Sequence, residues 1–369
     1  MASTVNIGLE GVVVAETAIS NVEGELGRLS YRGIDINVLV TKPYLQVVFL
    51  LLLGRNPSTN ELTEFEHFLI NAGRLNETEQ QVLSKLPKTL HPMLMLQSMV
   101  PMLNLENTEL LSFATENNQL RAGLIIAAKI PTLIANWFHL QKSNQLIEYP
   151  ALNNFHQNFL QQFNQQLPSE LQIHTLDLVQ MLQLEHSMNA GTFAGRVVAS
   201  TQAPVQSVIA ASIGALFGKL HGGADQAAVE MALEIGSPNN VADYVANKFA
   251  NKEKIMGMGH REYKVVDPRA TLLKPMAREL CQSPEHKNLL ATLETVEQEC
   301  RRHFEAKGQD IWANVEFYKG AVFQALGIPP QFFTAMFAMA RVNGYLAHFL
   351  EFNKNPRLIR PQAVYQCQS

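Results

Sequence analysis

Residues 331–350 read QFFTAMFAMARVNGYLAHFL and contain one charged side chain, Arg341. With the residues that follow, this stretch predicts a long apolar helix from about Gln331 to Phe352. A guanidinium on so apolar a helix must reach outward to water or meet an anion, because an unpaired buried charge is very costly. A structural carboxylate and the anionic group of a ligand would both satisfy Arg341. Acidic residues are scarce in the stretch, which favours the ligand.

Two other segments begin with clear helix-start signals. Pro204 precedes VQSVIAASIGALF (205–217), a segment without a polar face that should lie buried and end at Gly218. Asp267-Pro268 places a capping residue before proline at the first helical position, so Arg269 should lie in the first turn of a helix. Backbone amides at that point favour an anion.

Strand signals are confined to the beginning of the chain, so the fold class is mainly α. VVVAETAISNVEGELGRLSYRG (12–33) alternates and carries turn glycines, which indicates a short β-hairpin or two. The Asn/Gln-rich stretch 153–166 is expected to form a mobile surface helix. Boundaries near Gly222-Gly223 and near Gly327–Pro330 bracket a central block, interpreted as a smaller domain inserted into a larger one.

The composition excludes several classes of protein. The 369 residues carry a net charge of −4 and no basic stripe, which argues against nucleic-acid binding and polybasic membrane binding. The longest apolar run, Val47–Leu53, is far short of a membrane span of ~20 residues. Three scattered cysteines, Cys281, Cys300 and Cys367, give no disulfide framework and fit a reducing compartment. We therefore expect a cytoplasmic protein.

Familiar catalytic and metal-binding motifs are missing or incomplete. GMGHRE (257–262) lacks the third glycine of a dinucleotide loop, and GALFGKL (214–220) is one residue too short for a P-loop. Neither HExxH nor Gly-x-Ser-x-Gly occurs. The eleven histidines show no spacing typical of a metal site, so no metal is expected.

Two histidines stand beside glycines. His221 follows the buried segment in Gly-Lys-Leu-His-Gly-Gly, and His260 ends Met-Gly-Met-Gly-His. Both can be structural, but neighbouring glycines let a ligand approach the imidazole. Arg357 and Arg360 lie in a tail with few partners. Because arginine binds carboxylates with two parallel hydrogen bonds, these groups together suggest a polycarboxylate pocket, with the reaction left open.

Six segments, in the same order and over nearly the whole chain, resemble the citrate synthase family in its short, dimeric type. They are GLEGVVVAETAISNVEGELGRLSYRGIDI (8–36), EHSMNAGTFAGRVVAS (185–200), GALFGKLHGGAD (214–225), KIMGMGHREYKVVDPRA (254–270), NVEFYKG (314–320) and RVNGYLAHFLE with RLIRP (341–361).

This resemblance implies a multi-helical fold in two domains. The large domain would comprise residues 1–222 and 328–369, and the small domain, residues 223–327, would close over the substrates. The family works as homodimers in which an arginine crosses the interface, and Arg360 occupies that position here. The reaction implied is condensation of an acyl-CoA with oxaloacetate followed by thioester hydrolysis, with no permanently bound cofactor.

The resemblance also assigns roles residue by residue. His221 would hydrogen-bond the thioester oxygen, His260 would polarise the ketone of oxaloacetate, and Glu316 occupies the position of the base. The residues that would hold the oxaloacetate carboxylates are His186, Arg269, Arg341 and Arg360. The residues that would face coenzyme A are Ile255, Met256, Gly257, Met258, Gly259 and Lys264.

The base is the main departure from the family, whose aspartate is replaced by Glu316. Its extra methylene displaces the carboxylate by roughly 1.5 Å, and misplacement of about 1 Å can cost about 10²-fold in rate. Asp225 stands where asparagine is usual, and Lys319 and Gly191 where serine is usual. Leu94 and Gln97 replace charged residues. An active citrate synthase is the favoured interpretation. The alternatives are an alkylcitrate synthase such as 2-methylcitrate synthase, a near-silent homologue that binds oxaloacetate, and a reverse-direction or lyase-like CoA enzyme.

Overall fold

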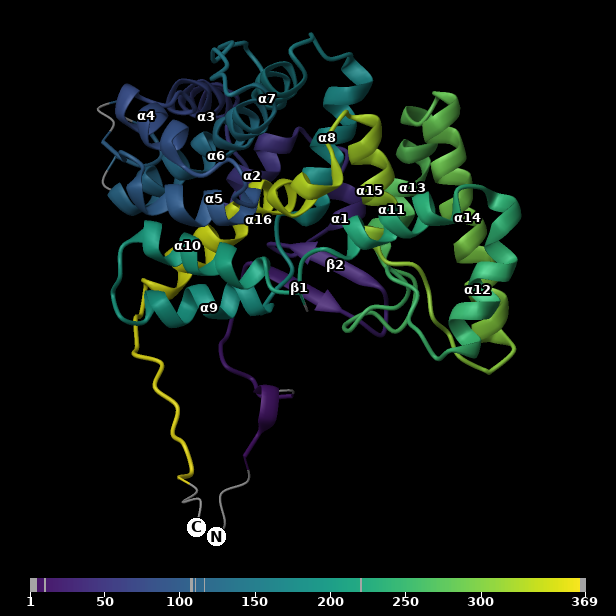
Figure 1. The fold of residues 1–369 in the computed structure, drawn as a ribbon. Coiled ribbons are helices and arrows are strands. Elements are labelled where there is room, and N and C mark those ends of the chain that lie inside the picture. The colour runs from purple at the N-terminus through teal and green to yellow at the C-terminus, as the bar shows by residue number, and fades with distance from the viewer. Residues whose placement is uncertain are drawn as a thin grey trace.

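The computed structural model describes residues 5–9, 11–106, 109, 111–115, 117–219 and 221–365. Within them the chain is mainly helical (Figure 1). The α-helices are α1 (Ile36–Leu39), α2 (Tyr44–Leu53), α3 (Thr59–Ala72), α4 (Glu77–Lys85), α5 (Pro92–Met99), α6 (Asn118–Ser143), α7 (Phe155–Asn164), α8 (Glu170–Gln183), α9 (Ala190–Ala199), α10 (Val205–Leu216), α11 (Ala224–Ile235), α12 (Val241–Ala250), α13 (Pro268–Leu280), α14 (Pro284–Glu305), α15 (Val315–Ala325) and α16 (Phe333–Phe352). The 3₁₀ turns are Ile7–Leu9, Val100–Met102, Pro238–Asn240 and Pro330–Phe332.

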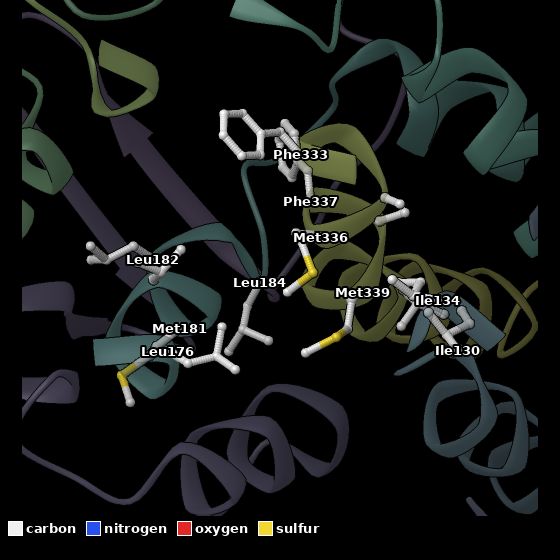
Figure 2. Packing of buried hydrophobic residues seen from close by; sticks show 14 of the residues in the cluster. Ile130, Ile134, Leu176, Met181, Leu182, Leu184, Phe333, Met336, Phe337 and Met339 are labelled. Atoms are coloured by element: carbon white, nitrogen blue, oxygen red, sulfur yellow. The ribbon is translucent and has the colours of Figure 1, made fainter. Parts of the chain in front are cut away.

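Helix α16 lies at the centre of the fold, as its apolar sequence predicts. Every residue from Phe333 to Phe349 is buried, and α2, α5, α6, α8, α9 and α10 all pack against it. Figure 2 shows side chains of α16, among them Met336 and Met339, gathered with apolar side chains of α6 and with Leu184 at the end of α8. Because α16 is surrounded by helices, a charge on it reaches water only through a cavity.

Helix α6 is long and apolar enough to cross a membrane by length and composition. However, 94% of its most apolar window is buried inside the fold, which is what the core helix of a globular protein requires. Helix α10 packs against α6, α16 and α9, and α9 also packs against α16. Helix α10 ends at Leu216, two residues before the expected Gly218, and one of its faces is only half-buried.

A small antiparallel sheet forms near the amino terminus, in the order β1 (Ser20–Glu23), β2 (Arg28–Tyr31) and β3 (Ile34–Asp35). Its register pairs Ser20 with Tyr31 and Glu23 with Arg28. The β1–β2 turn presses on residues 262–266: Gly24 O accepts a hydrogen bond from Lys264 N (3.1 Å), and a Cβ at Gly24 would lie 2.1 Å from Glu262 O. The predicted hairpin is therefore part of a wall around the loop that carries His260.

Helix α7 differs from the expectation for the Asn/Gln-rich stretch. Its Asn158 and Gln162 side chains are buried rather than on a mobile surface. Asn158 Oδ1 accepts a hydrogen bond from Leu152 N (2.7 Å), and Gln162 Nε2 donates to Ile147 O (3.3 Å). These amides satisfy the backbone of the preceding loop, so the predicted helix is confirmed but its expected surface position is wrong.

Helices α11 to α15 pack against one another on one side of the molecule (Figure 1). Both ends of the described chain run out from the other helices on a common side, and Val13 and Tyr365 are almost fully exposed. Cys281 and Cys300 are buried free thiols, whereas Cys367 lies outside the described residues. The central block bracketed by glycines in the sequence thus corresponds to a set of mutually packed helices.

Candidate active site

Two imidazoles, His186 and His260, meet between α8 and α13, and a third, His221, lies after α10. His186 follows α8, His221 lies in the turn between α10 and α11, and His260 lies in the loop before α13. The rings of His186 and His260 are 5.4 Å apart, and His186 Nε2 lies 3.2 Å from the Tyr263 hydroxyl oxygen. His221 Nε2 lies 3.3 Å from Asn189 Oδ1. The fold therefore brings His186 and His260 together, while His221 lies beside Asn189 and Phe337.

Glycines position the loop of His260. Gly257 and Gly259 have φ values of 82° and 85°, in the left-handed region that favours glycine. Gly257 O accepts from Asn314 N (2.9 Å), and Gly259 N donates to Trp312 O (2.7 Å). A Cβ at Gly257 would lie 2.6 Å from Phe317 Cδ2. The loop is thus bound to the segment before α15 and brought close to its first turn.

The hydrogen bonds of His260 fix its tautomer. Its Nδ1 accepts from the backbone amides of Glu262 (3.0 Å) and Tyr263 (3.2 Å). A neutral imidazole has one donor and one acceptor, so the proton lies on Nε2. That Nε2–H faces Arg269 Nη2 at 3.1 Å, which places two donors opposite each other. An anionic oxygen placed near both groups would accept from both and relieve this contact.

Arg269 has a carboxylate partner that sequence reasoning missed. Asp267 caps α13, accepts from Arg269 Nε (3.0 Å) and Nη2 (2.9 Å), and also accepts from Val315 N (3.2 Å). Both side chains are almost fully buried. Asp267 therefore holds the guanidinium of Arg269 and the start of α15 in one position. The sequence Asp-Pro-Arg predicts that Asp267 caps the helix, but it does not predict the ion pair with Arg269.

Arg341 is buried without an ion-pair partner among the described residues. It is 1% exposed, its Nε donates to Gln183 O (2.7 Å), and its guanidinium lies over the ring of Phe337 at 4.8 Å. Its other nitrogens contact no described carboxylate within 4.0 Å. A structural carboxylate that its charge reaches is the buried Glu185: against the effect of burial, His348 and then Arg341 lower the pKa of that carboxyl, without an ion-pair contact to Arg341.

Glu316 lies in the first turn of α15, where Asn314 Oδ1 accepts from its backbone amide (3.0 Å). Gln183 Nε2 donates to Glu316 Oε1 (3.2 Å), and the ammonium of Lys319 contacts Oε2. The same ammonium lies 3.1 Å from Asp225 Oδ2. The sequence analysis did not single out Gln183. Its backbone carbonyl accepts a hydrogen bond from Arg341, and its side-chain amide donates one to Glu316.

The three imidazoles are neutral at neutral pH. Burial, helped by Arg341 and opposed by Glu316, lowers the pKa of His221 to about 4. Burial and the neighbouring Arg269 lower the pKa of His260 to about 4, and the same two causes lower that of His186 well below its ordinary value. A neutral imidazole donates one hydrogen bond without carrying charge, which suits a group that stabilises a developing oxyanion.

Of the other residues predicted for the site, some line a cavity beside His260 and others lie in the carboxyl-terminal tail. Gly259, His260, Lys264 and Trp312 help to line a cavity of about 220 Å³. Lys264 Nζ donates to Arg261 O (3.0 Å), Ile255 is buried and Met256 is 42% exposed. Arg357 and Arg360 are exposed in the carboxyl-terminal tail, which runs out from the other helices (Figure 1). No group of three or more histidine, cysteine or acidic residues suited to a metal ion occurs in the described part of the chain.

The family model for the citrate synthase C-terminal domain matches residues 8–362. The chain is 38% identical to the citrate synthase of Acidithiobacillus ferridurans over 97% of this chain and 94% of that one. It is 33% identical to the citrate/2-methylcitrate synthase of Bacillus subtilis over 97% and 95%. The crystal structure of citrate synthase from Pyrobaculum aerophilum superposes with a TM-score of 0.90, at 33% identity over 98% and 92% of the two chains. A ternary complex of carboxymethyl coenzyme A and oxaloacetate with citrate synthase from Thermoplasma acidophilum gives 0.88, at 27% identity over 99% and 97%.

Proposed function

The chain belongs to the citrate synthase family, and from the geometry of its site we propose which residues carry out the condensation and how. As a member of that family it is an enzyme that transfers an acyl group to oxaloacetate. The favoured reaction is acetyl-CoA plus oxaloacetate plus water to citrate plus coenzyme A. The thioester is a co-substrate, and no permanently bound cofactor is part of the proposal.

The observation that carries the proposal is the unmatched positive charge and the facing donors of the site. His260 Nε2–H and Arg269 Nη2 lie 3.1 Å apart, and Arg341 is buried with no described carboxylate in contact. Oxaloacetate supplies two carboxylates and a ketone oxygen. We assign its carboxylates to Arg269, Arg341 and His186, and its ketone to His260.

The condensation then proceeds in three steps. Glu316 removes an α-proton from the acyl group while His221 donates a hydrogen bond to the thioester oxygen, which stabilises the enolate. The α-carbon attacks the ketone carbon of oxaloacetate, and His260 stabilises and protonates the resulting alkoxide. Water then cleaves the thioester of the product and releases coenzyme A.

The acyl-CoA is proposed to approach from the loop side of the site. Residues 255–259 and Lys264 would contact coenzyme A, next to the cavity beside His260. Acetyl is the favoured acyl group, and propionyl is the alternative because a relative of similar identity is named a citrate/2-methylcitrate synthase. Pocket size at the acyl position decides between them.

Domain closure and dimerisation complete the proposal. Residues 223–327 would form a small domain that closes on the large domain, residues 1–222 and 328–369, and excludes water during condensation. Arg360 is exposed in the carboxyl-terminal tail, which runs out from the other helices, and this supports its use by the neighbouring subunit of a homodimer. The proposed location is the cytoplasm, with no nucleic-acid or membrane partner.

A free-thiol assay tests the proposal. Oxaloacetate-dependent release of coenzyme A from acetyl-CoA is expected from the native chain, with propionyl-CoA and longer acyl-CoAs measured in parallel. The rate should drop to background in Glu316→Ala. Saturable oxaloacetate binding in a calorimeter, without release of thiol from any of these thioesters, would instead establish the near-silent homologue. Cleavage of citrate, in place of its synthesis, would establish a lyase.

A further inference from the structure

Three residues that depart from the family pattern form one buried cluster of charges. Lys319 is fully buried, Asp225 is 1% exposed, and the ammonium of Lys319 lies between the carboxylates of Asp225 (3.1 Å) and Glu316. We propose that Lys319, anchored by Asp225, is a positioning residue that holds the Glu316 carboxylate where it can reach the acyl group. This inference rests on the proposed role of Glu316 as the base.

Helix geometry places the three groups together. Glu316 and Lys319 are three residues apart on α15 and therefore share a face. Asp225 lies in the first turn of α11, which packs on α15. The ammonium also lies 4.4 Å from the centroid of the Phe337 ring of α16, so an aromatic face covers a side that the two carboxylates leave open. The position is thus set by three helices of the core.

The charges add up to one negative charge at the reacting position. Asp225 and Lys319 neutralise each other, and Glu316 contributes the remaining carboxylate. Asp225 Oδ2 and Lys319 Nζ have no aligned hydrogen bond with described residues, so the attraction is ionic rather than directional.

Both oxygens of Glu316 are occupied from opposite sides. Gln183, at the end of α8, donates to Oε1, while Lys319 contacts Oε2. A glutamate has one more rotatable bond than an aspartate and needs two restraints to keep its carboxylate in one place. Lys319 therefore compensates for the methylene that Glu316 adds. Each oxygen retains a lone pair with which to accept a proton.

The test is a mutant cycle with a readout of proton transfer. The Lys319→Met/Asp225→Asn double variant removes one positive and one negative charge, so the net charge of the cluster stays the same. We expect oxaloacetate to bind as in the native enzyme, kcat to fall about 10²-fold from a displacement on the order of 1 Å, and the deuterium isotope effect with perdeuterated acetyl-CoA to rise. Asp225→Asn alone is milder and should lower kcat about tenfold in the same way.

Glu316→Asp supplies the second arm of the cycle. In the native background the shorter side chain draws away from Lys319 and Gln183, so we expect kcat to fall at least tenfold. In the double variant the same substitution should cost little or raise kcat. An equal effect of Glu316→Asp in both backgrounds would overturn the proposal, as would native kcat and isotope effect in the double variant.

The matched control is the buried ion pair Lys129–Glu79, whose Nζ and Oε1 are 2.6 Å apart. Lys129→Met/Glu79→Gln also replaces a buried pair but should leave kcat and the isotope effect of the folded enzyme unchanged. Failure of the proposed function has a different signature. In that case native enzyme releases no coenzyme A, or Glu316→Ala retains the native rate, whatever the double variant does.

Discussion

Replacing Arg341 by methionine should separate binding from stability. In the free protein this guanidinium is buried with one hydrogen bond, to Gln183 O at 2.7 Å, and an aromatic ring at 4.8 Å. Replacing a buried charge that has no ion-pair partner by an apolar side chain of similar length relieves the cost of keeping that charge out of water. The lost hydrogen bond and ring contact each cost about 1 kcal/mol. We therefore expect the free energy of unfolding to change by no more than about 1 kcal/mol.

Binding of oxaloacetate should respond much more strongly. A carboxylate held by two charge-assisted hydrogen bonds gains about 1.5 kcal/mol or more from each. Their loss amounts to about 3 kcal/mol, or a roughly 10²-fold rise in Kd. Isothermal titration calorimetry with oxaloacetate measures the affinity, and urea denaturation without ligand measures the stability.

Arg196 provides the matched control. It is also a buried arginine, but its Nη1 contacts Glu351 Oε2 (3.1 Å) and His348 Nδ1 (2.9 Å). Arg196→Met leaves the Glu351 carboxylate without its cation and should cost about 3 kcal/mol of stability, with oxaloacetate affinity unchanged. The reasoning fails if Arg341→Met is as destabilising as Arg196→Met while its Kd for oxaloacetate stays native.

Four further predictions concern residues of the site. Asp267→Asn keeps a cap for α13 but leaves Arg269 unpaired, so the free energy of unfolding should fall by about 3 kcal/mol. Saturating oxaloacetate should restore part of this loss. A native melting temperature in calorimetry would contradict the prediction. Because the pKa values of His221 and His260 lie at about 4, a plot of kcat/KM against pH should show no fall on the acid side near pH 6.5. A fall there that disappears in a His221 or His260 variant would refute this prediction. Their unfolded forms take up protons below pH ~6.5, so stability should decline from there towards pH 4, by up to roughly 3 kcal/mol for each imidazole, as urea titrations over this range would reveal. Mixing inactive Arg360→Ala and His260→Ala chains should recover about a quarter of native activity if subunits of a dimer share sites, whereas no recovery after verified subunit exchange would argue against sharing.

Much of the fold was readable from local patterns. The apolar run around Arg341 predicts the buried helix α16, and Asp267-Pro268 predicts the start of α13. The hairpin is confirmed with a third short strand added. These features depend on neighbours in the sequence, which is why they can be predicted. The buried amides of α7 could not, because their partners belong to a loop whose path the sequence does not reveal.

The site was predicted as a set of residues and not as a set of contacts. Asp225 and Lys319 were noted as separate departures, since nothing in their spacing indicates that α11 packs on α15. Gln183 went unnoticed because a glutamine at the end of a helix is ordinary in sequence. Its importance comes from lying between Arg341 and Glu316, which only the tertiary packing determines.

The hairpin turn at Gly24 has a practical consequence for work on this protein. Its backbone rests on the segment that follows His260, with no space for a side chain between them. The turn between β1 and β2 therefore supports the loop that carries His260. Truncations or fusion tags near the hairpin would alter turnover without removing any residue that lines the cavity, and libraries for new acyl donors should vary this turn together with the loop it supports.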